Sequence, residues 1–102
     1  MTLYANIPTM ISVNSYFDGK VQSLGFQAES GKATVGVMLP GEYVFGTSSK
    51  EEMRIVSGTL EVKLPEEPTF KAYNPGDVFF VEPNVKFTVK LNGPVSYLCL
   101  YN

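Results

Sequence analysis

The sequence predicts an all-β fold, a closed sandwich or barrel formed by a single domain. The chain has 102 residues, nine of them Gly and seven Pro, and these turn-forming residues recur at short, even intervals. The segments between them are rich in Val, Phe, Tyr and Thr, the residue types that favour strands. Hydrophobic residues make up 44% of the chain, which is enough for a packed core.

Nine short segments between the turn signals are expected to form strands. They are residues 20–26, 32–39, 42–45, 53–56, 59–64, 69–73, 77–81, 86–91 and 95–101. Each is bounded by pairs such as Asp18-Gly19, Pro40-Gly41 or Ser57-Gly58, which favour chain reversal. The one helical candidate, residues 48–53, is a single turn at most.

The domain is expected to span residues 14–102, preceded by an N-terminal extension of residues 1–13. The extension has mixed polarity and contains Pro8, so it is either a loose arm or an extra strand that pairs with a partner subunit. Residues 78–81 and 97–101 are apolar on both strand faces. One face should line the interior and another sheet or subunit should cover the other, which predicts a homodimer.

The composition excludes several classes of protein. With no His, the chain has no Ser-His-Asp or Cys-His catalytic group and no His-based metal site. A net charge of −2 with scattered Lys and Arg offers no basic surface for nucleic acid. No membrane span or signal peptide is visible, so we expect a cytoplasmic protein. The single cysteine, Cys99, lies in an apolar run and is expected to be a buried structural thiol.

Period-two alternation puts a carboxylate on an apolar strand face. Glu51 lies on the same side as Met53 and Ile55. One interpretation is that the carboxylate reaches water at the end of the strand. The other is that it lies at the rim of a pocket, where it can accept hydrogen bonds from sugar hydroxyls or stabilise positive charge. Tyr43 and Phe45 also share one side, and their rings are either ordinary core or a platform for a flat heterocycle.

A second alternating face carries hydroxyl and ammonium groups. Lys86, Thr88 and Lys90 alternate with apolar residues. This face is either a solvated exterior or a surface that receives a phosphate through charge and hydroxyl donors.

Residues 41–58 and 75–81 resemble the two sequence motifs of the cupin superfamily, jelly-roll β-barrels that usually hold a metal. In metal-binding cupins the first motif has two His separated by one residue, then a Glu, and a Gly seven residues after that Glu. Glu51 and Gly58 keep this spacing, but Phe45 and Thr47 stand at the two His positions, and the His of the second motif would fall near Thr88. The resemblance therefore implies a cupin-like barrel without a metal ligand set.

A longer series of segments resembles the small single-domain cupins of the pyrimidine/purine nucleoside phosphorylase family. The segments are NSYFDGKVQSLGF, ATVGVMLPGEYVF, SGTLEVKLP, YNPGDVFFV and SYLCLY, in this order from Asn14 to the C-terminus. The resemblance implies phosphate-dependent cleavage of the N-glycosidic bond of purine and pyrimidine nucleosides. The products would be free base and pentose 1-phosphate, with no metal or organic cofactor.

That reaction needs a platform for the base, acceptors for the sugar hydroxyls and donors for phosphate. We expect Tyr43 and Phe45 to stack on the base and Glu51 to act at the sugar, with Met53 beside it. Arg54 is a weaker phosphate candidate, because its parity points away from Glu51. The stronger phosphate candidates are Thr47, Thr88 and Lys90.

Two other functions compete with this interpretation. The chain fits a non-catalytic cupin that binds a small molecule or acts as a scaffold after losing its metal ligands. A cupin-type sugar isomerase or epimerase would be expected to use a His base, which this chain lacks.

Overall fold

The computed structural model describes residues 10–102, which form ten strands and no helix. None of these residues forms a helix that could cross a membrane. The strands are β1 (Ser12–Tyr16), β2 (Val21–Ala28), β3 (Gly31–Met38), β4 (Gly41–Gly46), β5 (Glu51–Ser57), β6 (Leu60–Lys63), β7 (Lys71–Tyr73), β8 (Val78–Val81), β9 (Lys86–Leu91) and β10 (Val95–Tyr101). The all-β prediction is confirmed. Of the expected N-terminal extension, residues 1–9 lie outside the described part of the chain.

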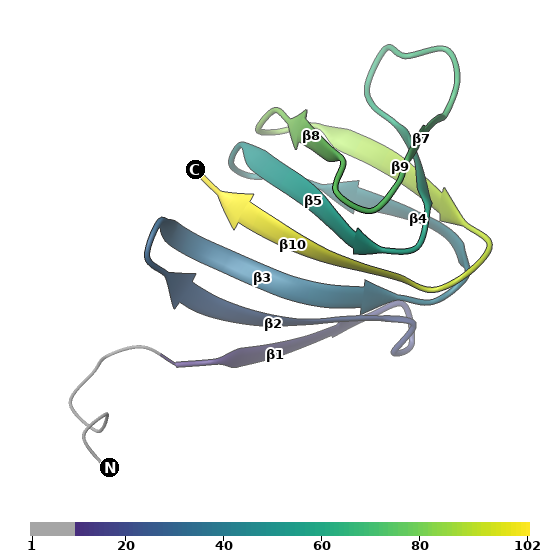
Figure 1. The fold of residues 1–102 in the computed structure, drawn as a ribbon. Helices are drawn as coiled ribbons and strands as arrows, with labels where there is room; N and C mark the ends of the chain where they lie inside the picture. The colour runs from purple at the N-terminus through teal and green to yellow at the C-terminus, as the bar shows by residue number, and fades with distance from the viewer. Residues whose placement is uncertain (1–9) are drawn as a thin grey trace.

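The strands form two antiparallel sheets that face one another as layers (Figure 1). The larger sheet has the order β1-β2-β3-β10-β5-β8 and the smaller one β4-β9-β6-β7. Within residues 10–102 no ladder joins the two sheets, so the closed barrel that we expected is an open, cupin-like sandwich. The physical reason is visible between β3 and β4, where Pro40 has no N–H to continue a ladder and Gly41 turns the chain into the other sheet.

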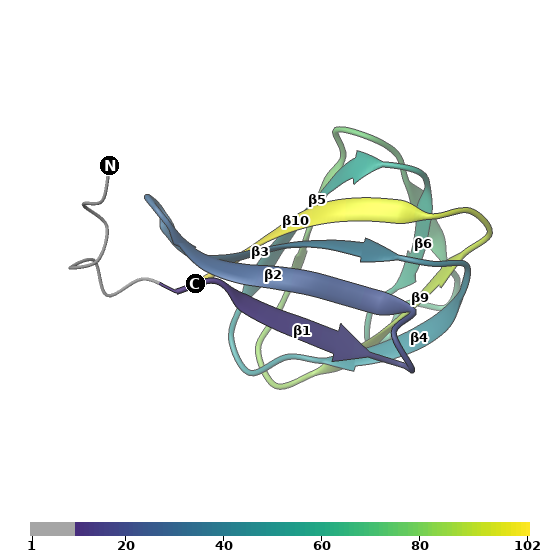
Figure 2. The same cartoon turned by 90° about the horizontal axis from the view of Figure 1, so that it is seen from below.

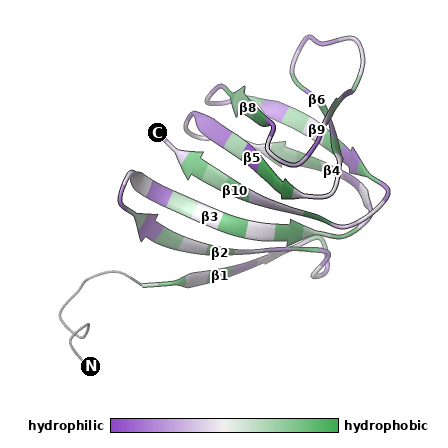
Figure 3. Cartoon of the chain, in the orientation of Figure 1, coloured by the Kyte–Doolittle hydropathy of each residue, from purple (hydrophilic) through white to green (hydrophobic). Residues whose placement is uncertain are grey.

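The core lies between the sheets and is formed by alternate residues of the strands. Leu60 and Val62 of β6 and Phe87 and Val89 of β9 are buried, as their period-two spacing predicts. In β5, Met53 and Ile55 are buried and Arg54 between them is exposed. Figure 3 shows that β5 carries hydrophilic and hydrophobic residues in succession along its length. The buried cluster also takes in residues of the larger sheet such as Val21, Met38 and Val95, so both sheets contribute to one core.

The turn between β5 and β6 requires a glycine. Gly58 has a φ of +83°, and a Cβ there would collide with the carbonyl oxygen of Pro94. We expect Gly58→Ala to lower the free energy of unfolding by about 2 kcal/mol or more, because backbone strain and the clash add. Chemical denaturation measures this loss. Gly93→Ala is the matched control, since no atom lies within 4 Å of its added Cβ; equal stability of the two variants would contradict the prediction.

Candidate functional site

A cavity of about 490 Å³ lies between the sheets, against β1, β2, β3 and β10. Its volume falls in the range of about 300–1,000 Å³ typical of small-molecule sites. The polar part of its wall consists of Ser12, Asn14, Tyr16, Ser23, Lys32, Thr34, Glu51, Tyr97 and Tyr101. The apolar part includes Phe17, Met38, Phe45, Met53, Phe87, Val89 and Cys99.

The cavity exists because the inward positions of β2 and β3 carry small or hydroxylic residues. Ser23 and Gly25 are inward on β2, and Thr34 and Gly36 are inward on β3. Gly36 lies opposite Tyr97 of β10, and a Cβ there would come within 2.5 Å of the tyrosine hydroxyl. The Tyr97 ring takes the space that a side chain at Gly36 would fill, and the Ser12 hydroxyl does the same at Gly25. The two glycines therefore let these polar groups reach the cavity wall.

An aromatic wall closes the side of the cavity that faces β4. Phe17, in the turn after β1, packs edge-on against Phe45 of β4 with 5.6 Å between ring centroids. Phe45 in turn lies 5.8 Å from the ring of Phe87. Figure 2 shows β1 at the edge of the larger sheet and β4 in the layer facing it. The contact between Phe17 and Phe45 joins these two layers. Phe17 has a positive φ of 54°, a strained conformation for a bulky residue.

Glu51 contributes the carboxylate of the cavity. It begins β5, where it pairs with Tyr101 of β10, and its Oε1 accepts a hydrogen bond from the Cys99 thiol over 3.6 Å. Burial raises the pKa of the Glu51 carboxyl because it disfavours the charged form, and the Cys99 hydrogen bond partly offsets this effect. The Glu51 carboxyl therefore takes up a proton at a higher pH than a carboxyl in water, and a ligand that changes its surroundings can change its protonation.

Tyr97, Tyr101 and Cys99 lie near Glu51 and are neutral at pH 7. Thr34 Oγ1 and Tyr101 Oη share a hydrogen bond of 3.1 Å, and burial raises the pKa of the Tyr101 phenol. Burial likewise raises the pKa of Tyr97 to about 12 and that of Cys99 to about 12. Cys99 is 1% exposed, which confirms the expected buried thiol. At neutral pH the phenols and the hydroxyl are therefore hydrogen-bond donors as well as acceptors.

Of the residues that the sequence nominates, Glu51, Phe45 and Met53 meet at the cavity. Tyr43 lies behind the aromatic wall, 5% exposed, with its hydroxyl donating to the carbonyl of Leu39 over 2.8 Å. Its ring is 4.8 Å from that of Phe17. Tyr43 thus supports the wall, whereas Phe45 borders the cavity itself.

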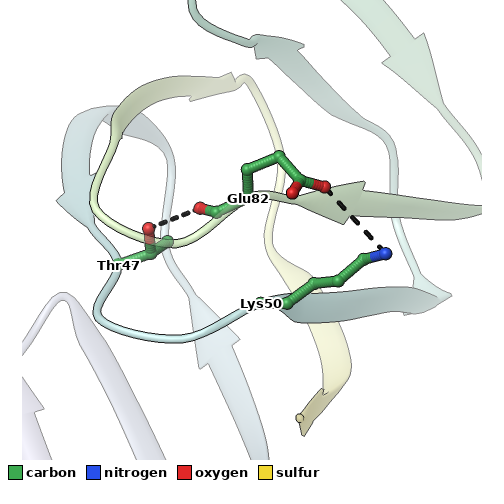
Figure 4. A network of polar contacts seen from close by, with 3 residues as sticks. All are labelled: Thr47, Lys50 and Glu82. Atoms are coloured by element: carbon green, nitrogen blue, oxygen red, sulfur yellow. Dashed lines mark hydrogen bonds and ion pairs between the residues drawn. The ribbon is translucent and has the colours of Figure 1, made fainter.

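Thr47 lies outside the cavity and joins two loops (Figure 4). Its hydroxyl donates to the carbonyl of Glu82 over 2.7 Å and accepts from the backbone N–H of Val85 over 3.2 Å. Lys50 and Glu82 add an exposed ion pair of 4.0 Å nearby. The Thr47 side chain therefore holds the loop after β4 against the loop after β8.

The remaining nominated residues lie on outer faces of the sandwich. Thr88 and Lys90 alternate with the buried Phe87 and Val89, so they face away from the core. Lys90 Nζ lies 4.3 Å from the centroid of the Phe70 ring. Arg54 also faces outward, and its Nε donates to Glu52 Oε2 over 2.6 Å. The structure does not bring these three residues together with Glu51.

A family model described as pyrimidine/purine nucleoside phosphorylase matches residues 11–101. The chain belongs to the pyrimidine/purine nucleoside phosphorylase family. A protein of that name from Rhodopirellula baltica is 54% identical over 92 residues, which cover 90% of this chain and all of the relative. Another from Pseudomonas putida strain GB-1 is 50% identical and covers 90% of this chain and 98% of the relative.

Solved structures agree with the fold of this phosphorylase family member. A protein of unknown function from Vibrio parahaemolyticus superposes with a TM-score of 0.85 at 46% identity, over 88% of this chain and 96% of the other. An RmlC-like cupin from Shewanella frigidimarina superposes with a TM-score of 0.65 at 18% identity, over 97% and 87% of the two chains. The second likeness identifies the fold as cupin-like.

The cavity of this phosphorylase family member does not have the donors of a metal-binding cupin. Phe45 and Thr47 occupy the positions of the two His in the first motif, and the Thr47 hydroxyl is bonded to a loop. Within residues 10–102 no group of three or more His, Cys, Asp or Glu is arranged to hold a metal ion. Glu51 is the single carboxylate among the described residues that line the cavity, and one carboxylate does not make a metal site.

Sequence reasoning missed the hydroxylic side of the cavity and its lysine. The missed residues that matter most are Lys32, Thr34, Tyr97 and Tyr101. A usable signal was present, because Ser23-x-Gly25 and Thr34-x-Gly36 put small residues at period two in segments that also contain Val, Leu and Phe. Such a pattern on an inward face indicates a cavity rather than a packed core.

Proposed function

We propose that this protein cleaves purine and pyrimidine nucleosides with inorganic phosphate, releasing free base and pentose 1-phosphate without a metal or organic cofactor. The observation that carries the proposal is the cavity itself, in which a carboxylate, an aromatic wall and a set of hydroxyls border one space of about 490 Å³. Membership of the phosphorylase family supports the reaction class. The proposal includes a cytoplasmic location, in keeping with the free thiol of Cys99.

The aromatic wall fits a base that is recognised by stacking. Phe45 and Phe17 present ring faces and edges rather than paired donors and acceptors. Stacking is tolerant of base identity, because every nucleobase has a π-face. Purines and pyrimidines are therefore expected to be accepted alike, with Tyr43 supporting the wall from behind.

Glu51 fits the role of the carboxylate that stabilises the positive charge on the sugar. Cleavage of an N-glycosidic bond develops positive charge at the anomeric carbon, and a carboxylate in a water-poor cavity stabilises such charge strongly. The bound nucleoside would favour the ionised carboxylate and offset the burial that raises its pKa. The hydroxyl of Tyr97 supplies a further partner for the sugar.

The decisive test is release of free base from uridine, inosine and guanosine by protein treated with a chelator, with and without inorganic phosphate. Phosphate-dependent release from all three, followed by chromatography, is the expected result. No release under either condition would favour the non-catalytic binding or scaffold function. Release without phosphate would identify a hydrolase instead.

We further propose that the outer face of the larger sheet joins two copies of this chain. Six side chains on that face are apolar and 39–61% exposed, namely Leu24, Val35, Val37, Val56, Val78 and Phe80. The Glu52–Arg54 ion pair on the same face has no net charge, so it would not repel the same face of a second copy. Light scattering should give twice the chain mass, and Val37→Lys should give one chain mass. A wild-type mass of one chain would rule the dimer out.

A further inference from the structure

Lys32, Tyr101 and Glu51 form a row across the larger sheet at one end of the cavity. Tyr101 pairs with Glu51 of β5, and on its other side Leu100 pairs with Ala33 of β3, which puts Lys32 beside Tyr101. The Lys32 Nζ lies 5.4 Å from the centroid of the Tyr101 ring. Because neighbouring strands are about 4.8 Å apart, Lys32 and Glu51 are separated by about 10 Å of sheet, with Tyr101 between them.

This row has opposite charges at its two ends. Of residues 10–102, Lys32 is the one basic residue that borders the cavity, and Glu51 is the one acidic residue. The Lys32 ammonium is exposed and has no carboxylate of the described chain within 4.0 Å. An ammonium without a carboxylate partner, held over the rim of a cavity, is suited to a ligand that carries negative charge.

Hydroxyl donors lie next to the ammonium. Thr34 Oγ1 and Tyr101 Oη are 3.1 Å apart, and one hydrogen serves the bond between them. The other hydroxyl hydrogen is left to donate to a ligand. The remaining hydroxyl hydrogen and the Lys32 ammonium make a donor set for a tetrahedral oxyanion. The separation from Glu51 limits repulsion between the anion and the carboxylate.

We propose that Lys32, together with the hydroxyls of Thr34 and Tyr101, forms the phosphate subsite of the cavity. This inference rests on the proposed function and adds the residues that bind the second substrate. One phosphate oxygen forms a bond to the anomeric carbon as the bond to the base nitrogen breaks. The electron pair leaves with the base, which takes up the proton that the hydrogen phosphate loses. Lys32 holds the remaining phosphate oxygens on one side of the sugar, and Glu51 lies toward the other end of the row.

The subsite differs from the phosphate candidates that the sequence suggested. Thr88 and Lys90 lie on the outer face of the smaller sheet, with the buried side chains of β9 between them and the cavity. A phosphate bound there could not reach a sugar beside Glu51. The two locations therefore make opposite predictions for variants of the two lysines.

The test is steady-state kinetics with phosphate varied at saturating inosine and inosine varied at saturating phosphate. Lys32→Met should raise the KM for phosphate at least about tenfold and leave the KM for inosine within about twofold, since a charge-assisted contact to one substrate is lost. Tyr101→Phe should raise the KM for phosphate several-fold, about the effect of one neutral hydrogen bond. Lys63→Met, at an exposed lysine of β6, is the matched control and should match the wild type. Lys32 is exposed, so unchanged circular dichroism and thermal melting are expected for its variant.

A KM for phosphate within twofold of wild type in Lys32→Met overturns the subsite, and so does a tenfold rise produced by Lys90→Met alone. A wild-type protein that releases no base with phosphate overturns the proposed function instead. In that case the subsite is tested by titrating inorganic phosphate, observed by ³¹P NMR. Binding to the wild type that is lost in Lys32→Met supports the anion site, and absence of binding to the wild type overturns it.

Discussion

Glu51→Gln is expected to lower kcat about 10²-fold, equivalent to about 2.7 kcal/mol of transition-state stabilisation. The amide keeps the size of the side chain and the contact with the Cys99 thiol, but it cannot stabilise positive charge at the anomeric carbon. Initial rates of base release from inosine at saturating phosphate measure the effect. Glu42→Gln, at an exposed carboxylate of β4, is the matched control and should retain wild-type turnover.

The pH dependence of kcat/KM provides a second readout for Glu51. If the carboxylate is the active form, the rate falls as pH decreases through its pKa, and burial raises that pKa above the ordinary value of 4.5. The acidic limb of the wild type should therefore lie at a higher pH than an exposed glutamate would give, and Glu51→Gln should lack it. Unchanged turnover in a folded Glu51→Gln protein would remove this residue from the mechanism.

Stability should change in the opposite sense from activity. A carboxyl whose pKa is raised in the folded state loses stability as pH rises from its unfolded value through its folded value. Glu51→Gln removes this penalty, so its melting temperature should exceed that of the wild type at pH 8, and the difference should vanish below pH 4.5. A higher melting temperature with a lower kcat would separate a functional carboxylate from a structural one.

Phe45→Leu is expected to raise the KM for uridine and for inosine by about tenfold each. Stacking of a base on an aromatic ring contributes about 1–3 kcal/mol, and leucine keeps much of the apolar volume while it removes the π-face. Equal effects on a pyrimidine and a purine nucleoside would indicate that the ring recognises the base by its face. The KM for phosphate should stay near the wild-type value, which separates this variant from Lys32→Met.

Phe70→Leu is the control for this substitution. Phe70 is aromatic and half-buried but lies beside Lys90 on the outside of the smaller sheet. It should leave both nucleoside KM values unchanged. An equal rise in Phe70→Leu, or a rise for one nucleoside alone in Phe45→Leu, would argue against a stacking platform at Phe45.

The amino-acid sequence by itself determined the all-β class, the family and the carboxylate. The segments between Gly and Pro are short and rich in β-branched and aromatic residues, and their apolar residues do not recur at the spacing of a helix. The two-residue repeat of a strand puts Glu51 on the same face as Met53 and Ile55, and the structure shows the same arrangement. The all-β class and the face of Glu51 depend on neighbours within one strand, and the family rests on motifs in their order along the chain. Local geometry is enough to settle the first two.

Only the tertiary structure decided which faces turn inward and which strands meet. Period two puts Thr88 and Lys90 on one face of their strand and Lys32 and Thr34 on one face of theirs. It does not say that the first pair faces outward and that the second pair borders a cavity. Lys32 and Glu51 come to lie on either side of Tyr101 because β10 pairs with both β3 and β5. These contacts join positions far apart in the chain, and their register is set by the packing of the whole sandwich rather than by any local segment.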